Sequence, residues 1–338
     1  MEHAAIPDVP VPASRVGLGT WAMGGVQWGG ADDPESVRTI HAALDLGVTL
    51  IDTAPAYGFG HSEEVVGTAL SQRGGREGVI VATKCGLEPR GETVVRNSTR
   101  QHIFAEIEQS LRRLRTEYID LYQVHWPDLF TPFEETAAAL LDLQRAGKVR
   151  AIGVSNYSIE AMERFRRVAP HASAQPPLNL FEQDALRDLI PWCQANGVAT
   201  LTYGALCRGL LTGDIDQNTR FEGDDLRKTD PKFQPPRFSQ YIQAVQQLDR
   251  FAEDRFGKSV LPLAVRWVLD QPGVSVALWG ARHPGELLPL HDVMGWKLDS
   301  DALAEIRGIV AGTVHDPVGP EFMAPPEQRP QGARPRSS

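Results

Sequence analysis

Short runs of apolar residues alternate along the chain with longer stretches in which apolar residues recur every three or four positions. The short runs predict β-strands, and the longer periodic stretches predict amphipathic α-helices. Strands that are apolar along their whole length are typical of a parallel sheet covered by helices on both faces. The strands expected from this pattern lie at residues 15–21, 48–52, 79–82, 119–124, 149–154, 172–175, 198–203 and 274–278.

Start signals precede several of the predicted helices. An N-cap residue followed by proline, or by Glu or Gln three positions later, is typical of the first turn of a helix. Such pairs occur at Asp33-Pro34, at Ser98 with Gln101, and at Thr131 with Glu134. The third of these helices is expected to end at Ala146-Gly147, because glycine is favoured just beyond a helix C-terminus.

About eight strand–helix units of this kind predict an α/β protein with a (β/α)8 TIM-barrel fold. A doubly wound sheet is the alternative, but no Gly-x-Gly-x-x-Gly turn follows the first strands. We expect residues 1–315 to form one barrel domain. Residues 316–338 hold six prolines and predict a disordered tail. Residues 206–236 form a long polar stretch, which is expected to be either a functional lid or disordered.

Composition narrows the possible partners. The net charge of -9 argues against a nucleic-acid surface. No uncharged apolar run reaches about 18 residues, which argues against a membrane span. The N-terminus lacks the pattern of a secretory signal, so a cytoplasmic protein is expected. The three cysteines, Cys85, Cys193 and Cys207, have neither metal-binding nor disulfide-like spacing.

Four polar residues stand where apolar runs end: Asp52, Tyr57, Lys84 and His125. In a barrel the active site lies at the carboxyl ends of the strands, so these side chains are expected to meet there. Tyr57 is a candidate general acid, and a nearby ammonium such as Lys84 would lower its pKa. Asp52 would keep Lys84 charged, and His125 would orient a substrate oxygen.

Several segments of the chain resemble the aldo-keto reductase family. They are Gly19–Gly24, Ile51–Gly58 with Ser62–Gly67, Ala82–Lys84, Leu111–His125, Lys148–Asn156, Gln175–Asn179 and Arg208–Gly213, and they span roughly residues 14–310. Within that family the chain is most similar to bacterial members that carry a Trp-Gly-Ala-Arg segment, here Trp279–Arg282.

The resemblance implies a barrel that binds NADP(H) without a Rossmann domain and transfers hydride reversibly between nicotinamide and a carbonyl carbon. The implied catalytic tetrad is Asp52, Tyr57, Lys84 and His125, with Tyr57 as proton donor. The implied cofactor contacts are Thr20, Trp21, Gln27, Ser155, Asn156, Gln175, Tyr203, Leu206, Arg208, Gly209, Gly280 and Arg282. Trp21, Trp28 and Trp126 are candidates for the wall of the substrate pocket, and no metal is expected.

The chain departs from the family pattern at the far end of the cofactor site. Gly204-Ala205 stands where many members have Ser-Pro, which should loosen the start of the following loop. Asp214 replaces a common lysine, and the expected Glu-Asn pair after Arg282 is missing. Arg282 is therefore the best local partner for a 2′-phosphate, because a guanidinium matches phosphate geometry. Arg220 is a second phosphate candidate.

Three functions fit these observations. The favoured one is an NADPH-dependent enzyme that reduces aldehydes or ketones, with a small-molecule carbonyl as its substrate. The others are a redox-sensing subunit that binds NADP(H) with little turnover, and a Schiff-base lyase that uses Lys84. The physiological carbonyl, the oligomeric state and the strength of the preference for NADPH over NADH stay open.

Overall fold

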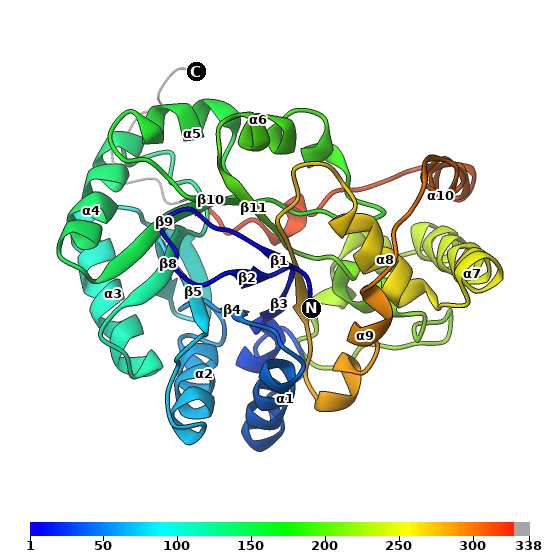
Figure 1. The fold of residues 1–338 in the computed structure, drawn as a ribbon, viewed down its shortest axis with the longest axis horizontal. Coiled ribbons are helices and arrows are strands. Elements are labelled where there is room, and N and C mark those ends of the chain that lie inside the picture. The colour runs from blue at the N-terminus through cyan, green and yellow to red at the C-terminus, as the bar shows by residue number, and fades with distance from the viewer. Residues whose placement is uncertain (328–338) are drawn as a thin grey trace.

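Eight parallel strands close into a barrel and follow one another around it in chain order (Figure 1). The structure is a computed structural model that describes residues 1–327. The barrel strands are β3 (Val16–Gly19), β4 (Leu50–Asp52), β5 (Ile80–Cys85), β8 (Ile119–Val124), β9 (Val149–Ser155), β10 (Ser173–Gln175), β11 (Ala199–Thr202) and β12 (Val276–Gly280). The predicted (β/α)8 barrel is thereby confirmed, and each strand overlaps a predicted apolar run.

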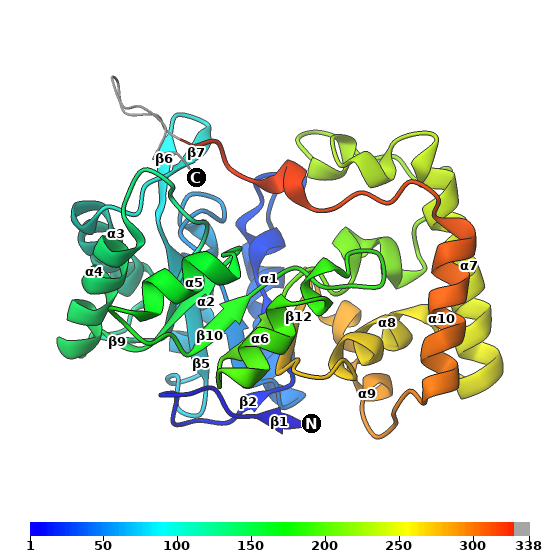
Figure 2. The same ribbon diagram turned by 90° about the horizontal axis from the view of Figure 1, so that it is seen from above.

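Helices surround the barrel. They are α1 (Asp33–Asp45), α2 (His61–Gln72), α3 (Arg100–Leu114), α4 (Phe133–Arg145), α5 (Ile159–Arg166), α6 (Leu189–Ala195), α7 (Arg237–Phe256), α8 (Val260–Leu269), α9 (Leu290–Val293) and α10 (Ser300–Thr313). Every residue of α8 is buried, which explains why this segment is apolar on all sides. Helices α7 and α10 lie side by side outside α8 (Figure 2).

One end of the barrel is closed by the N-terminus. Strands β1 (His3–Ala4) and β2 (Ala13–Ser14) pair in antiparallel fashion. Ile6, in the connection between them, belongs to the apolar cluster that fills the barrel together with Leu50, Leu121 and Leu201. A second, larger cluster joins the strands to the surrounding helices. The closed end leaves the carboxyl ends of the strands as the face on which polar side chains gather.

The helix starts differ in detail from their predictions. Asp32, not Asp33, caps α1 by accepting the N–H of Glu35. Thr99, not Ser98, caps α3 by accepting the N–H of His102. Helix α4 begins without a side-chain cap, because its N-cap position is Pro132, which offers no side-chain acceptor. The Thr131 hydroxyl lies one residue earlier and donates to Asp128.

The C-terminal segment corrects another expectation. Residues 316–327 were expected to be disordered, yet they cross the face that carries the strand ends (Figure 2). The segment is held because Arg96 pairs with Glu327 over 3.1 Å and Lys232 donates to the carbonyl oxygen of Gly319 over 3.1 Å. Arg96 belongs to β7 (Thr93–Arg96), which forms a hairpin with β6 (Leu87–Arg90). Residues 328–338 lie outside the described part of the chain.

The long stretch 206–236 is also ordered. It contains three short 3-10 turns, η3 (Cys207–Thr212), η4 (Leu226–Lys228) and η5 (Pro231–Phe233). Within residues 1–327, no helix combines the length and apolar character needed to cross a membrane. The same residues hold no cluster of three or more His, Cys, Asp or Glu side chains suited to a metal ion.

Candidate active site

Three neighbouring strands bring the four singled-out side chains together. Asp52 ends β4, Lys84 is the fifth residue of β5, and His125 follows β8. The Lys84 ammonium donates to Asp52 Oδ1 over 2.5 Å and to the Tyr57 hydroxyl over 3.1 Å. Its third bond goes to the carbonyl oxygen of Thr53 over 3.0 Å. All three donors of a fully buried ammonium are therefore used.

A close backbone contact sets the position of Tyr57. Gly24, in the loop after β3, packs against the turn Tyr57–Gly58. A Cβ on Gly24 would lie 2.6 Å from the carbonyl carbon of Tyr57, and a Cβ on Gly58 would lie 2.1 Å from the Gly24 carbonyl oxygen. Gly58 also has a φ of +62°, which favours glycine. Larger residues at either position would push the tyrosine away from Lys84.

A row of aromatic rings extends from this centre. The His125 and Tyr57 rings meet edge to face at 5.6 Å. Trp21 stacks on the other side of Tyr57 at 6.0 Å, and Trp28 meets Trp21 edge to face at 5.4 Å. His125 Nδ1 and Trp28 Nε1 are both buried without a hydrogen-bond partner in the described chain. Of the three tryptophans expected near a substrate, Trp21 therefore borders the tyrosine and Trp28 borders Trp21.

The electrostatics of the centre correct one expectation. Burial raises the pKa of Tyr57, and although the Lys84 ammonium lowers it, the net pKa stays above its ordinary value. Burial lowers the pKa of Lys84, but Asp52 and Tyr57 outweigh this and raise it. Burial, with help from Lys84, holds the pKa of His125 well below 6.5. The resting centre thus holds a neutral phenol, an ammonium and a neutral imidazole.

Two glutamines complete the surroundings of Asp52. Gln175 Nε2 donates to Asp52 Oδ2 over 2.9 Å, and Gln123 Nε2 approaches the same oxygen at 3.4 Å. Gln175 was expected to touch a cofactor, and Gln123 was not singled out. The available signal was an amide inside β8, near the end of the strand that precedes His125. Both amides contact Oδ2 of the carboxylate, which leaves Oδ1 for the Lys84 ammonium.

A second polar group stands at the ends of β9 and β11. Asn156 donates to the carbonyl oxygen of His125 over 3.0 Å and accepts from the Tyr203 hydroxyl over 2.9 Å. Ser155 donates to the carbonyl oxygen of Gln175 over 2.9 Å. Asn156 has a φ of +59°, a conformation that asparagine tolerates better than most residues. Ser155, Asn156, Tyr203 and the backbone of Gln175 therefore lie together at the strand ends, and their contact with a cofactor stays a prediction.

Three other candidates have side chains that are already engaged. Thr20 is fully buried, and its hydroxyl donates to the carbonyl oxygen of Asp52 and accepts from Ser62. Arg208 is buried and points into the protein, where it pairs with two carboxylates. Arg220 is exposed and bonds to carbonyl oxygens of its own loop. The structure therefore does not support side-chain contacts from Thr20 or Arg208 to a cofactor.

A bridge that the sequence analysis missed spans the mouth of the barrel. Asp224 accepts the backbone N–H groups of Gln27 and Gly29 over 2.7 and 3.1 Å. Two residues further on, Leu226 donates its N–H to the carbonyl oxygen of Gln27 over 3.0 Å. Arg227 reaches the carbonyl oxygen of Arg208 at 3.5 Å. Loop 206–236 is thus joined to the loop after β3.

The remaining candidates lie around this bridge. Arg282, which is exposed, donates to the carbonyl oxygen of Gly30 over 3.3 Å. Gly280 ends β12 and pairs with Gly19 of β3, while Leu206 and Gly209 flank the start of η3. Arg227 also pairs with Asp225 over 2.6 Å. Burial alone would raise the pKa of Asp225, but the hydrogen bonds of Arg227 and the charges of Arg227 and Arg282 outweigh it and lower that pKa.

Trp126, the third expected wall of the pocket, lies on the other side. Its ring is partly buried, and the Arg96 guanidinium lies 5.4 Å from its centroid. Because Arg96 also holds Glu327, Trp126 is next to the C-terminal segment. This segment therefore borders the mouth of the barrel.

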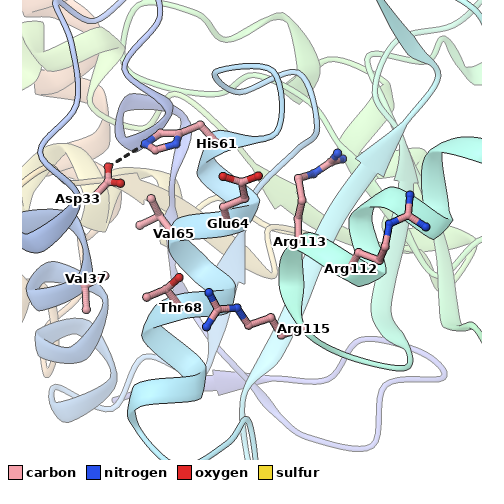
Figure 3. A pocket seen from close by; sticks show the side chains of 9 residues that line it. All are labelled: Asp33, Val37, His61, Glu64, Val65, Thr68, Arg112, Arg113 and Arg115. Atoms are coloured by element: carbon pink, nitrogen blue, oxygen red, sulfur yellow. Dashed lines mark hydrogen bonds and ion pairs between the residues drawn. The ribbon is translucent and has the colours of Figure 1, made fainter.

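A separate hollow opens on the outer helical layer, between α1, α2 and α3 (Figure 3). It has a volume of about 430 Å³ and is lined by Asp33, Val37, His61, Glu64, Val65, Thr68, Arg112, Arg113 and Arg115. Its charges are largely balanced, since Asp33 pairs with His61 and Arg113 pairs with the buried Glu63, each over 2.7 Å. No tetrad residue lines it.

Known proteins share both the fold and the sequence. The model of the Aldo/keto reductase family matches residues 15–311. The aldo-keto reductase YhdN of Bacillus subtilis (strain 168) is 57% identical, over 96% of this chain and 98% of its own length. The NADH-specific methylglyoxal reductase of Escherichia coli (strain K12) is 33% identical, over 85% of this chain and 91% of its own.

Two solved structures extend the comparison. A glycerol dehydrogenase from Gluconobacter oxydans has a TM-score of 0.86 and 52% identity, covering 95% of this chain and 99% of its own. An aldo-keto reductase from Klebsiella pneumoniae, solved in complex with NADPH, has a TM-score of 0.70 and 28% identity, covering 92% of this chain and 96% of its own.

Proposed function

The chain belongs to the aldo/keto reductase family, and we propose that it is an NADPH-dependent oxidoreductase that reversibly reduces aldehydes or ketones to alcohols. The observation that carries the proposal is the contact of one ammonium, that of Lys84, with both the Tyr57 hydroxyl and the Asp52 carboxylate. A phenol held beside a buried ammonium can give up its proton to an oxygen that is becoming negative.

Tyr57 is the proposed proton donor. Its pKa lies above the ordinary value, so the phenol is protonated before reaction. When it gives its proton to the carbonyl oxygen, the resulting phenolate stands 3.1 Å from the Lys84 ammonium. Because that ammonium is already in place and shielded from water, it stabilises the phenolate without reorganisation.

Asp52 and His125 are proposed to support this step in different ways. Asp52 keeps Lys84 charged and in position, as the raised pKa of Lys84 indicates. His125 is neutral, so its ring can donate one hydrogen bond to a substrate oxygen without adding a competing charge.

The mouth of the barrel fits a nicotinamide dinucleotide. The ring of Tyr203 is partly exposed while its hydroxyl is anchored on Asn156, so one face of the ring is fixed for stacking. Ser155 and Asn156 place a hydroxyl and an amide beside it. When bound, the reduced cofactor supplies the hydride. The residues named here would hold its nicotinamide end and set which face is presented to substrate.

A preference for NADPH rests on the far end of the site. Arg282 is exposed at the end of β12, and a guanidinium suits a 2′-phosphate. Arg227 is a second guanidinium nearby, and it replaces Arg220 as our secondary phosphate candidate. One relative is described as NADH-specific and another is solved with NADPH, so the family accommodates both.

The substrate is proposed to be a small carbonyl compound or, in the reverse direction, its alcohol. Relatives are described as a methylglyoxal reductase and a glycerol dehydrogenase, which act on small oxygenated molecules. Trp21 stacks on Tyr57 and Trp28 packs against Trp21, and in such aromatic pockets a few polar groups orient a small substrate.

The direct test is NADPH oxidation by the purified protein with a panel of aldehydes, ketones and diols as substrates. Consumption of NADPH with methylglyoxal or a simple aldehyde is the expected result. Tight binding of NADPH with no turnover across the panel would favour the redox-sensing alternative instead.

The Schiff-base lyase alternative has less support. An amine attacks a carbonyl only when it is unprotonated. The raised pKa of Lys84 and its three hydrogen bonds keep the group as an ammonium. Failure of borohydride to trap any carbonyl compound on Lys84 is therefore expected.

A further inference from the structure

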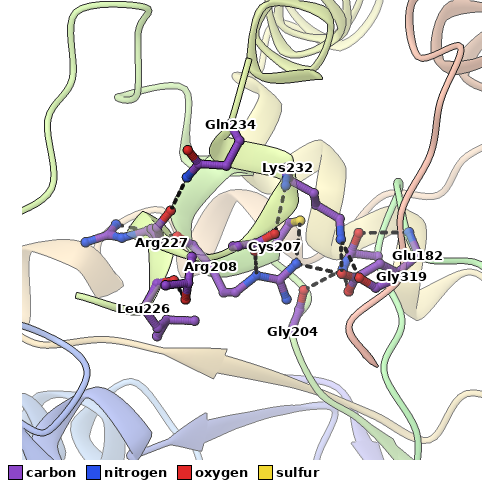
Figure 4. A network of polar contacts seen from close by, with 12 residues as sticks. Glu182, Gly204, Cys207, Arg208, Leu226, Arg227, Lys232, Gln234 and Gly319 are labelled. Carbon is purple, nitrogen blue, oxygen red and sulfur yellow. Dashed lines mark hydrogen bonds and ion pairs between the residues drawn. The ribbon is translucent and has the colours of Figure 1, made fainter. Parts of the chain in front are cut away.

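Four buried charged side chains form a network beneath the loop that follows Tyr203 (Figure 4). Glu182 accepts from Arg208 over 2.6 Å and from Lys232 over 2.8 Å. Asp230 accepts from Arg208 Nε over 2.5 Å. Asp230 and Lys232 are fully buried, and Glu182 and Arg208 are more than nine-tenths buried. Two acids and two bases balance, so the network can be buried without leaving an unpaired charge.

The network is attached to the backbone at both ends of a short loop. At one end, Asn179 donates to Glu182 Oε2 over 2.7 Å and to the carbonyl oxygen of Gly204 over 3.0 Å. Gly204 directly follows Tyr203. At the other end, the Arg208 side chain itself is a member of the network. Residues 204–208 are therefore fastened at their first and last positions.

The fastened loop ends in an unusual backbone turn. Cys207, Arg208 and Gly209 have consecutive φ values of +47°, +57° and +88°. Left-handed conformations are costly for residues with a Cβ, and they persist only where the surroundings impose them. The two ion pairs of the Arg208 guanidinium supply such a constraint, since they draw its side chain inward and away from the mouth of the barrel.

The turn lies on the side of the mouth where phosphate-binding groups gather. Arg227 Nη1 lies 3.5 Å from the carbonyl oxygen of Arg208, and a Cβ on Gly209 would lie 3.5 Å from the same nitrogen. Arg208 thus presents its backbone, and not its side chain, to the side of the mouth where Arg227 lies. The direction of the Arg208 guanidinium therefore decides whether the backbone or the side chain of this residue is turned toward a bound cofactor.

We propose that Glu182, Asp230 and Lys232 are positioning residues for the cofactor, which act through Arg208 to hold the Cys207–Gly209 turn in its binding conformation. The proposal rests on the proposed function, because it takes the dinucleotide as the ligand of this loop. It also explains how the loop stays ordered although Gly204-Ala205 replaces the stiffer Ser-Pro.

The network reaches one further element. Lys232 donates to the carbonyl oxygen of Gly319, and Arg208 lies 5.6 Å from the ring centroid of Phe322. Both partners belong to the C-terminal segment that borders the mouth. A substitution in the network should therefore alter contacts both in the Cys207–Gly209 turn and in the C-terminal segment.

The test is a pair of variants, Asp230→Asn and Lys232→Met, titrated with NADPH and with NADH by protein fluorescence. Each variant should raise both dissociation constants by a similar factor, about tenfold, which corresponds to 1.4 kcal/mol. Because no tetrad residue changes, kcat at saturating cofactor should stay within about twofold. Lys232→Met keeps most of the length of the side chain, and it tests the network on its own if Asp230→Asn does not fold.

A matched control is Asp270→Asn. Asp270 pairs with Arg266 over 2.7 Å, and Arg266 is fully buried in α8. This variant should lower Tm as the network variants do, yet leave both dissociation constants unchanged. If the network variants lower Tm without weakening the binding of either cofactor, the network is merely structural and the proposal is wrong. Loss of NADPH affinity alone, or a loss confined to kcat, would overturn it as well.

The wild-type titration separates this proposal from the proposed function. If the wild-type protein bound neither cofactor, the proposed function would fail before the network was tested. If it bound NADPH and both variants bound it equally well, only the positioning role would fail.

Discussion

The Lys84 ammonium donates a hydrogen bond to the Tyr57 hydroxyl over 3.1 Å. These residues lie on different strand–loop units, and the contact exists because β4 and β5 are parallel neighbours that end at the same face of the barrel. The same ammonium is held by Asp52, so the phenol faces a cation whose position and charge are set by the protein. Four predictions follow from this arrangement and from the bridge across the mouth.

Replacing Tyr57 with phenylalanine should remove the proton donor while keeping the ring that packs between Trp21 and His125. We expect kcat for aldehyde reduction to fall roughly 100- to 10,000-fold, the range typical of general acid catalysis. The dissociation constant for NADPH should change little. Steady-state kinetics measures the fall in kcat, and fluorescence titration measures the dissociation constant for NADPH. Turnover at the wild-type rate would refute the role of Tyr57.

The pH profile of reduction should be flat through the neutral range. The pKa of Tyr57 is raised, so the acid loses its proton only as pH rises above the ordinary range of a tyrosine. The pKa of His125 is lowered well below 6.5, so the imidazole becomes charged only as pH falls far below that value. Measuring kcat against pH tests this, with protein stability followed over the same range.

The informative control for the profile is His125→Gln. An inflection near 6.5 in the wild-type protein that disappears in this variant would mean that the imidazole titrates in its ordinary range. That result would contradict the burial that we infer for the resting site.

Arg282→Ala should weaken the binding of NADPH more than the binding of NADH. The expected loss for NADPH is about tenfold or more, since hydrogen bonds to charged groups contribute roughly 1.5–3 kcal/mol. Fluorescence titration with both cofactors gives the ratio. Arg220→Ala is the control and should leave both affinities unchanged, because that side chain bonds to the carbonyl oxygens of Gln217 and Thr219. Equal losses for the two cofactors in Arg282→Ala would show that Arg282 does not read the 2′-phosphate.

Asp224→Ala should loosen the bridge over the mouth. The carboxylate holds two backbone N–H groups of the loop after β3, so its removal should speed NADPH dissociation by about tenfold. Stopped-flow displacement of bound NADPH measures this rate. Asp216→Ala is a control in the same loop, because Asp216 bonds only to its near neighbours Asn218 and Thr219. A dissociation rate unchanged by Asp224→Ala would mean that the bridge does not retain the cofactor.

The sequence by itself determined the architecture and the meeting of the four polar side chains proposed to be catalytic. Apolar runs spaced by periodic stretches specify strands and covering helices, and parallel strands in a barrel must end on one face. Polar residues at the ends of β4, β5 and β8 therefore had to approach one another, whatever the details of packing. Asp52, Lys84 and His125 could be assigned to one site for this reason, and Tyr57 because it lies in the loop that follows β4.

Only the tertiary structure decided where side chains point and which distant loops touch. Arg208 turns inward because Glu182 and Asp230 offer it buried carboxylates, a partnership that no local pattern shows. The Asp224 bridge joins residues 197 positions apart, and the order of residues 316–327 depends on Arg96 and Lys232. The direction of the Tyr57 pKa also belongs here. Sequence shows the neighbouring charge, but the burial that outweighs it exists only after the chain has packed.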